Sequence, residues 1–267
     1  FLRHRCQAAA RVRARGPRRP ARRTGAARMR RATSALLALA FTALPAMAEA
    51  ACRQALALGL DVSGSVDTRE YRLQLDGLAG ALETPSVRAA LLALPGHPVE
   101  VAVYEWSGPD DQALILPWTA VTEATVLQDI TARLRATQRR DSTPGTALGT
   151  AMQYGAALLA TRSDCARHTL DISGDGISNF GPRPREVRRA LETRDLTINA
   201  LVIGADDPVA GDSRQAEIGS LSSYFRAEVI LGPGAFVQTA LGFEDYRRAM
   251  TQKLLRELDG MVFSSLR

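Results

Sequence analysis

The strongest constraint on this fold is an alternation of short apolar segments with longer segments of helical periodicity. Segments with the length and composition of buried strands occupy 55–62, 99–107, 112–118, 168–176 and 196–204. Apolar residues at helical spacing lie between and after them, at 67–83, 126–134, 146–161 and 243–261. This order predicts an α/β domain: a doubly wound, mainly parallel sheet flanked by helices, with one antiparallel hairpin at its edge.

Charge is distributed unevenly along the chain. The formal net charge is +6, but residues 1–32 hold 12 of the 34 basic residues, and no acid precedes Glu49. From Glu49 onward, the remaining 22 basic residues stand against 28 acidic residues, which gives a net charge of −6. A mildly acidic domain without a basic block is unsuited to a phosphate backbone, so no nucleic-acid partner is predicted.

An export signal is predicted at residues 29–48. This segment begins with arginines, continues as an apolar run and ends in Ala-Met-Ala, so cleavage is expected between Ala48 and Glu49. Its apolar run is short for a membrane span, which favours a periplasmic or secreted protein without a stable span; a retained anchor is the alternative. Residues 1–28 lack a periodic apolar face and are expected to be untranslated or disordered, which leaves 49–267 as one domain.

Oxygen-bearing side chains occur where predicted strands and helices meet loops. Asp61, Ser63 and Ser65 end the first strand in alternation. Thr146 lies in a Gly/Pro turn before a helix, and Asp175 lies at the exit of a buried strand. Ligands of open α/β sheets bind beyond the carboxyl ends of the strands, so these side chains are expected at one edge. Hard divalent cations such as Mg²⁺ take oxygen ligands of this kind.

In type and order, these five residues resemble the metal-ion-dependent adhesion site (MIDAS) of von Willebrand factor type A (VWA) domains. The resemblance covers most of residues 52–205, and the C-terminal part resembles an exported bacterial VWA-like family of unknown function. It implies a Rossmann-like VWA fold in which Ser63 and Ser65 bind Mg²⁺ or Mn²⁺ directly and Thr146 binds directly or through water. It also implies that Asp61 and Asp175 act mostly through water and by hydrogen-bonding the serines. The implied function is an exported binding module whose cation captures an Asp or Glu carboxylate of a protein or peptide.

Other interpretations stay open from the sequence. Asp61 and Ser63 could cap the next helix, and Asp67 has the spacing of a capping pair with an acid three residues later. A metal-dependent hydrolase, or a structural VWA domain with an unused metal site, are alternative functions. Catalysis needs a general base or an activated nucleophile beside the metal, and neither His97 nor His168 shows such a pattern. A non-enzymatic protein is therefore predicted.

Four neighbouring residues are assigned lesser roles. Thr143 is a weaker candidate than Thr146, because Gly149 and the residues after it have the superfamily's register only with respect to Thr146. Asp171, inside a strand, is predicted to be a buried hydrogen-bonded acid or to point outward. Ser173 and Asn179 flank the acid that lies between them and could orient it.

Cys52 and Cys165 are the two cysteines that follow the predicted export signal. Cys52 lies nine residues before Asp61, and Cys165 lies ten residues before Asp175. If the two aspartates meet at one end of adjacent parallel strands, the cysteines meet near the other end. We therefore predict a Cys52–Cys165 disulfide, a bond typical of an oxidising compartment.

Overall fold

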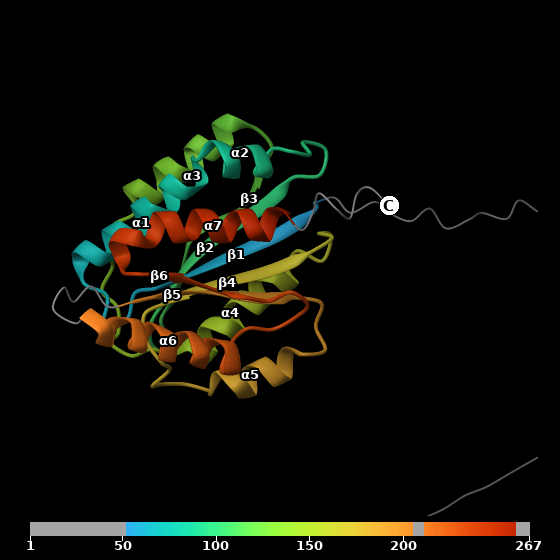
Figure 1. Ribbon diagram of the computed structural model, residues 1–267. Coiled ribbons are helices and arrows are strands. Elements are labelled where there is room, and N and C mark those ends of the chain that lie inside the picture. Colours follow the sequence, from blue (N-terminus) through green and yellow to red (C-terminus); the bar gives the residue numbers. More distant parts are fainter. Residues whose placement is uncertain (1–51, 205–210, 260–267) are drawn as a thin grey trace, which may run out of the picture. The chain divides into compact units, whose positions relative to one another are not determined.

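The computed structural model describes residues 52–204 and 211–259, which belong to one compact unit. The predicted export signal, its cleavage site and residues 1–28 lie outside these residues. Six strands form a single sheet in the order β3-β2-β1-β4-β5-β6 (Figure 1). Their bounds are β1 (Gln54–Asp61), β2 (Val99–Trp106), β3 (Gln112–Val121), β4 (His168–Gly174), β5 (Thr197–Ile203) and β6 (Val237–Ala240). All neighbours are parallel except β2 and β3, which form the predicted antiparallel edge hairpin.

Helices cover both faces of the sheet, which confirms the doubly wound α/β architecture (Figure 1). One face carries α1 (Thr68–Leu82), α2 (Pro85–Leu91), α3 (Ala124–Ala136) and α7 (Tyr246–Asp259), the last preceded by a 3₁₀ turn, η1 (Phe243–Asp245). The other face carries α4 (Leu148–Ala160), α5 (Pro184–Leu191) and α6 (Gly211–Glu228). Each layer of helices encloses its own apolar core against the sheet.

Strand β1 contributes to both cores. Leu56, Leu58 and Leu60 pack into the core on the side of α1 and α7, while Ala55 and Ala57 pack into the core on the side of α4. A central parallel strand is covered on both faces, which explains why this segment is apolar in nearly every position. The leucines fill space beneath large helices, and the alanines admit the close approach of α4.

The strand order reverses between β1 and β4. From β1 the chain continues to β2 and β3 on one side of the sheet, and it returns to β4, β5 and β6 on the other. Leu60 is paired with Ser173, so β1 and β4 leave the sheet at nearly the same level. At their opposite ends Cys52 and Cys165 are bridged, with Cα atoms 4.5 Å apart, and form the predicted disulfide. Ligands of open α/β sheets bind at such a switch point.

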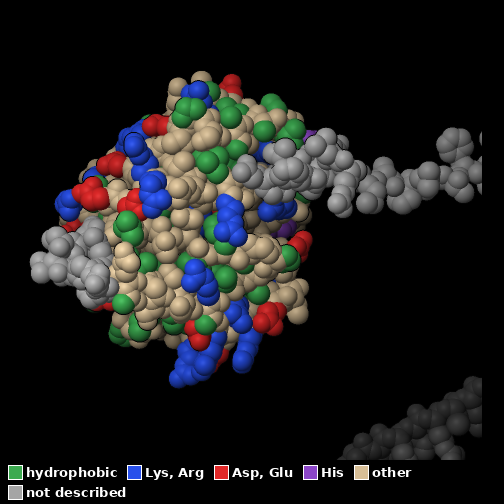
Figure 2. All heavy atoms as spheres, viewed as in Figure 1, with side chains coloured by type: hydrophobic (Ala, Val, Ile, Leu, Met, Phe, Trp, Pro, Cys, Tyr) green, Lys and Arg blue, Asp and Glu red, His purple; other side chains and the backbone are tan. Residues whose placement is uncertain are grey.

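The surface agrees with the charge distribution of the sequence. On the face that Figure 2 shows, basic and acidic side chains are interspersed, and basic side chains gather at the end where α5 lies. Arg183, Arg185 and Arg189 are exposed there. Within 52–204 and 211–259, no helix has both the length and the apolar character that a membrane crossing requires.

Candidate metal centre

The five predicted oxygen-bearing residues lie at the carboxyl ends of β1 and β4. Asp61 is the last residue of β1, and the loop from β1 to α1 carries Ser63 and Ser65. Thr146 lies two residues before α4, and Asp175 directly follows β4. Asp61 and Ser63 are fully buried, whereas Ser65 is exposed. The cluster therefore extends from buried positions at the end of β1 to the solvent-exposed surface.

Hydrogen-bond distances connect the three loops. Thr146 Oγ1 lies 3.3 Å from Ser63 Oγ, which in turn lies 3.3 Å from Ser65 Oγ. Ser65 Oγ donates to Asp175 Oδ1 at 2.8 Å. The backbone N–H of Ser63 donates to Asp61 Oδ1, also at 2.8 Å. The structure thus brings together all five side chains that the sequence places in one site.

The carboxyl group of Asp61 provides a test of whether a cation fits this cluster. Its Oδ2 atom is buried and has no hydrogen-bond partner. Burial, and after it the charge of Asp175, raises the pKa of Asp61 to about 8, and burial also raises the pKa of Asp175. A divalent cation would offset the mutual repulsion of the two carboxylates and give Oδ2 a partner, directly or through water. With three hydroxyls and two carboxylates, the donor set suits a hard cation.

Thr146 is held in place by the loop that follows Asp175. Its backbone N–H donates to Asn179 Oδ1 at 2.8 Å, and its carbonyl oxygen accepts from the N–H of Asn179 at 3.0 Å. From the sequence, Asn179 and Ser173 could orient Asp175; in the structure, the side chain of Asn179 holds Thr146. Ser173 Oγ lies 3.0 Å from the hydroxyl of Tyr246 on α7. Each of these two side chains therefore contacts a partner other than Asp175.

Thr143 faces a different part of the structure from Thr146. Its Oγ1 accepts from the N–H of Gly108 at 3.0 Å, and its own N–H donates to Asp111 Oδ2 at 2.7 Å. Arg140 pairs with the same Asp111 carboxylate. Thr143 therefore anchors its loop to the turn of the β2–β3 hairpin, while Thr146 reaches the cluster.

The helix cap of α1 is formed by Asp67 rather than by Asp61 or Ser63. Asp67 Oδ1 accepts from the N–H of Glu70, and Glu70 Oε2 accepts from the N–H of Asp67, both at 2.8 Å. This reciprocal capping box confirms the predicted capping pair. It satisfies backbone N–H groups at the start of α1 without a contribution from Asp61 or Ser63.

A second group of metal-ligand types lies near the opposite end of β1. Among the described residues, Cys52, Glu100 and Cys165 bring ligand atoms within 4.8 Å of one another. The two sulfur atoms are joined in the disulfide, and Glu100 pairs with Arg162. Since thiolates and not disulfide sulfurs bind metals, this group is not a candidate metal site.

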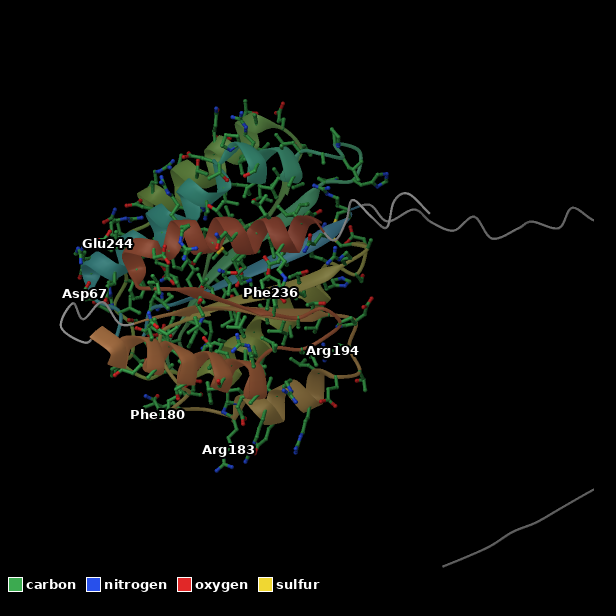
Figure 3. All side chains as sticks on the ribbon, viewed as in Figure 1. Asp67, Phe180, Arg183, Arg194, Phe236 and Glu244 are labelled. Atoms are coloured by element: carbon green, nitrogen blue, oxygen red, sulfur yellow. A yellow bond between two sulfur atoms is a disulfide. The ribbon has the colours of Figure 1, made fainter. Side chains whose placement is uncertain are left out.

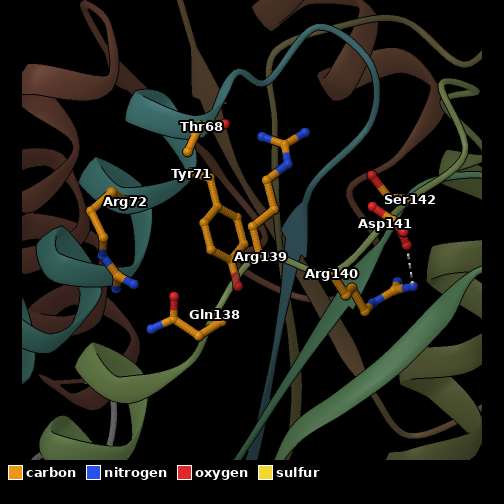
Figure 4. Close-up of a pocket in the computed structure, with 8 residues that line it drawn as sticks. All are labelled: Thr68, Tyr71, Arg72, Gln138, Arg139, Arg140, Asp141 and Ser142. Atoms are coloured by element: carbon orange, nitrogen blue, oxygen red, sulfur yellow. Dashed lines mark hydrogen bonds between the residues drawn. The ribbon is translucent and has the colours of Figure 1, made fainter.

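A pocket lined by arginines lies beside the cluster. It has a volume of about 560 Å³, and Figure 4 shows Tyr71, Arg72, Arg139 and Arg140 around it. Arg72 Nη1 donates to the carbonyl oxygen of Thr137 at 2.8 Å. Arg140 pairs with the carboxylates of the β2–β3 hairpin, and Arg72 and Arg139 stack against the Tyr71 ring. These arginines chiefly fasten the loop before α4 to α1 and the hairpin.

A second pocket, of about 610 Å³, has an apolar character and adjoins the Thr146 loop. Pro109, Pro144 and Phe180 contribute to its walls. Phe180 is 56% exposed and Ile177 is 60% exposed, although both are large apolar side chains. Figure 3 shows Phe180 at the same end of the molecule as Asp67, where the loops of the cluster lie. An apolar rim thus borders the oxygen cluster.

A buried charged group between β4 and α7 was not indicated by any sequence motif. Asp171 contacts Lys253, whose Nζ lies 2.7 Å from Asp171 Oδ2 and 2.5 Å from Glu257 Oε1. Asp171 is buried rather than pointing outward, but its partner is a lysine in an ion pair, and neither of its oxygens takes part in a hydrogen bond. The available signal was a Lys–Glu pair four residues apart on an otherwise apolar helix face, together with an acid inside a buried strand.

Comparisons with known proteins agree with this architecture. The model of a family described as "Protein of unknown function (DUF1194)" matches residues 51–262. No curated protein matches the chain.

Several solved structures share the fold at low sequence identity. Proximal thread matrix protein 1 (PTMP1) from the mussel byssus has a TM-score of 0.54 at 14% identity, covering 79% of this chain and 47% of that one. The pilus adhesin SpaC from Lactobacillus rhamnosus GG, in its open conformation, has a TM-score of 0.54 at 12% identity, covering 78% and 30%. The von Willebrand factor type A structure from Catenulispora acidiphila has a TM-score of 0.51 at 12% identity, covering 78% and 43%.

A further structure of PTMP1 has a zinc-occupied MIDAS motif, with a TM-score of 0.53 at 16% identity, covering 79% of this chain and 49% of that one. The chain therefore spans less than half of the length of these proteins. At such identities the similarity concerns the fold, and it confirms the VWA-type architecture.

Proposed function

The chain belongs to the DUF1194 family of proteins of unknown function, and we propose that it is an exported binding module that captures a partner's carboxylate through a divalent cation. Ser63, Ser65 and Thr146 would hold Mg²⁺ or Mn²⁺, while Asp61 and Asp175 would act mainly through water and through the serines. The observation that carries the proposal is the buried, unpartnered Oδ2 of Asp61 at the point where three loops converge.

The composition of the ligand set explains why a partner would be drawn to the cation. Three of the five donors are neutral hydroxyls, so the ion would keep part of its positive charge. An under-neutralised hard cation attracts an oxygen anion into an open coordination position. The zinc-occupied MIDAS motif of PTMP1 supports a divalent ion in a fold of this type. The choice of Mg²⁺ or Mn²⁺ rests on the oxygen-only donor set.

The surroundings of the cluster support a macromolecular partner. Phe180 and Ile177 expose apolar surface beside Asp175, next to the pocket lined by Pro109 and Pro144. Large exposed apolar side chains that border a polar site are typical of protein-interaction surfaces. We propose that the partner segment carries an Asp or Glu for the cation and a neighbouring apolar side chain for this rim.

Binding is better supported than hydrolysis. The cluster is built from hydroxyls and carboxylates, while His168 lies at the start of β4, where its Nε2 is 2.9 Å from the carbonyl oxygen of Arg162. A hydrolase would need a general base or a nucleophile aligned with the metal. The three hydroxyls are instead engaged with one another or with Asp175.

The Cys52–Cys165 disulfide supports export. Disulfides persist in oxidising compartments such as the periplasm and the extracellular space. We therefore place the proposed binding activity in one of these compartments.

The proposed site is tested by titrating Mn²⁺ and Mg²⁺ into the purified protein in a calorimeter. We expect one bound ion in the wild type and an affinity lower by about tenfold or more in Thr146→Val, which keeps the shape of the side chain and removes its oxygen. Thr146→Ser retains the oxygen and is the matched control, with binding close to that of the wild type. A wild-type protein that binds neither ion, or binds equally well in Thr146→Val, would contradict the proposal.

The proposed partner is tested by affinity capture with the same Thr146 variants. Protein immobilised in Mn²⁺ should retain the partner from a periplasmic or secreted fraction and release it in EDTA. Thr146→Val should retain much less, and Thr146→Ser should retain a similar amount. Retention that is unchanged by EDTA and by Thr146→Val would show that the interaction does not use the cation.

A further inference from the structure

The chain contains 33 arginines and a single lysine, and that lysine is buried. Lys253 lies on the inner face of α7 with no exposed surface. A guanidinium keeps its charge under all ordinary conditions, whereas an amine in an apolar site can lose its proton and become a nucleophile. The one position where this chain uses lysine is thus a position where amine chemistry is possible.

Two carboxyl groups contact the Lys253 amine. Nζ lies 2.7 Å from Asp171 Oδ2 and 2.5 Å from Glu257 Oε1, and the three side chains are at most 1% exposed. Neither oxygen of Asp171 takes part in a hydrogen bond, so the amine contacts this carboxyl group as an ion pair only. Reacting groups held this close and shielded from water have a very high effective concentration.

The environment favours the neutral form of the acid, Asp171. Burial raises the pKa of Asp171 to about 7; Glu257 adds to this effect, and the ammonium of Lys253 opposes it. The aromatic ring of Phe236 lies 5.4 Å from Nζ, and Figure 3 labels this residue near the sheet and α7. In an apolar site, transfer of a proton from the ammonium to the carboxylate removes two poorly solvated charges.

From this geometry we propose that Lys253 and Asp171 condense into an isopeptide bond inside the folded protein. The ammonium of Lys253 first gives a proton to the Asp171 carboxylate, which yields a free amine and a carboxylic acid. Nζ then attacks Cγ of Asp171, a second nitrogen-bound proton passes to the departing hydroxyl group, and one water molecule leaves. One C–N bond forms and one C–O bond breaks, with no oxidant, reductant or cofactor.

Glu257 is placed to carry the proton in this step. Its Oε1 atom contacts Nζ and also accepts from Asn199 Nδ2 at 2.8 Å. Its Oε2 atom is buried and has no hydrogen-bond partner. A carboxylate that touches the reacting nitrogen can accept the amine proton and return it to the leaving oxygen. The product would join β4 covalently to α7, and the dry surroundings would protect the amide from hydrolysis.

The bond is tested by tryptic peptide mapping of the full-length wild-type protein without reduction. Asp171 falls in peptide 168–185, because trypsin does not cleave before Pro184, and Lys253 falls within 249–256. We expect one branched peptide that joins both segments, lighter by one water than their sum, and no cleavage after Lys253. The Cys52–Cys165 peptide pair in the same digest reports that the chain folded natively.

Two variants assign the roles. Lys253→Arg cannot form the amide and must lack the branched peptide. Glu257→Gln keeps the volume of the side chain and is expected to lose most of the branched peptide, with free 168–185 in its place. Cleavage after Lys253 and an unmodified 168–185 in natively folded wild-type protein would overturn the proposal. A branched peptide at wild-type yield in Glu257→Gln would overturn the role of Glu257.

Discussion

Asp61 is the residue on which the proposed site depends most. It ends β1 at full burial, with one oxygen bound to the N–H of Ser63 and the other without a partner. Its only nearby charge in the cluster, Asp175, is of the same sign. Without a cation, this position favours a protonated acid; with a cation, it favours an anion. The protonation of Asp61 and the binding of the metal are therefore coupled.

We predict that the metal-free protein loses stability as the pH rises from about 4 to about 8. The pKa of Asp61 in the folded protein is about 8, above its ordinary value of 3.8, so the folded state keeps a proton that the unfolded state releases in this window. Asp61→Asn cannot titrate, and its unfolding free energy should fall less over the same range. Urea unfolding in EDTA at several pH values measures both slopes. Equal slopes would show that Asp61 ionises normally in the fold.

The positions of single residues were predictable only where a pattern marked them. The five oxygen-bearing residues and the Asp67 cap stand at strand ends and at a helix start, which the sequence displays. Asn179 could not be assigned to Thr146, because 33 residues separate them and only the loop geometry brings them together. Lys253 shows no motif, because its partner Asp171 lies on a strand far away in the chain.

Helix α4 connects two loops of the site through a close contact of backbones. Thr146 precedes its first turn, and Gly149 lies within that turn. A Cβ atom on Gly149 would lie 2.1 Å from the carbonyl oxygen of Pro182, in the segment that follows Asp175. The absence of a side chain therefore lets the start of α4 and this segment meet, which keeps Asn179 within reach of Thr146.

We predict that Gly149→Ala destabilises the fold by about 1–3 kcal/mol, since the added methyl group meets rigid backbone. It should also weaken Mn²⁺ binding by about tenfold, because the Thr146–Asn179 contact is pushed apart. The matched control is Gly219→Ala in α6, where a Cβ would meet nothing within 4 Å. This control should keep metal affinity and gain up to about 1 kcal/mol from helix propensity. Similar behaviour of the two variants would contradict the proposed contact.

At the scale of elements, helices and strands with strong hydrophobic periodicity were predicted from the sequence, whereas helices with weak periodicity were not. The β2–β3 hairpin, α1 and α7 have clear patterns, and the structure contains each of them. Helix α2 has seven residues, too few to establish a period, and α6 combines glycines and serines with scattered apolar residues. Helix α6 extends to Glu228, and β6 begins at Val237, after the Gly/Pro turn.

On the scale of the whole molecule, the disulfide and the candidate metal centre lie at opposite ends of β1 and β4. The bond between Cys52 and Cys165 closes a loop with a sequence separation of 113 residues. Both strands are central in the sheet, so the bond links the segments that lead into its two middle strands. The strand order could not be derived from the residues alone, because pairing between distant strands leaves no local pattern.

We predict that Cys52→Ser/Cys165→Ser lowers the free energy of unfolding by up to about 4–5 kcal/mol, through the larger entropy of an unfolded chain without this long loop. Metal affinity should stay near that of the wild type, because the site lies at the other end of the strands. Urea unfolding and Mn²⁺ titration measure the two effects. An unchanged unfolding midpoint would show that the bond contributes little to stability, and a lost metal site would show that the two ends are coupled.

The use of one enclosed lysine among 33 arginines has a consequence for the exterior of the protein. Every basic side chain at the surface is a guanidinium or an imidazole, so no surface lysine discharges as the pH approaches 10. The guanidinium groups stay protonated well beyond that value. The protein therefore keeps the positive charges of its surface arginines under alkaline conditions in which a lysine-rich surface would become increasingly anionic.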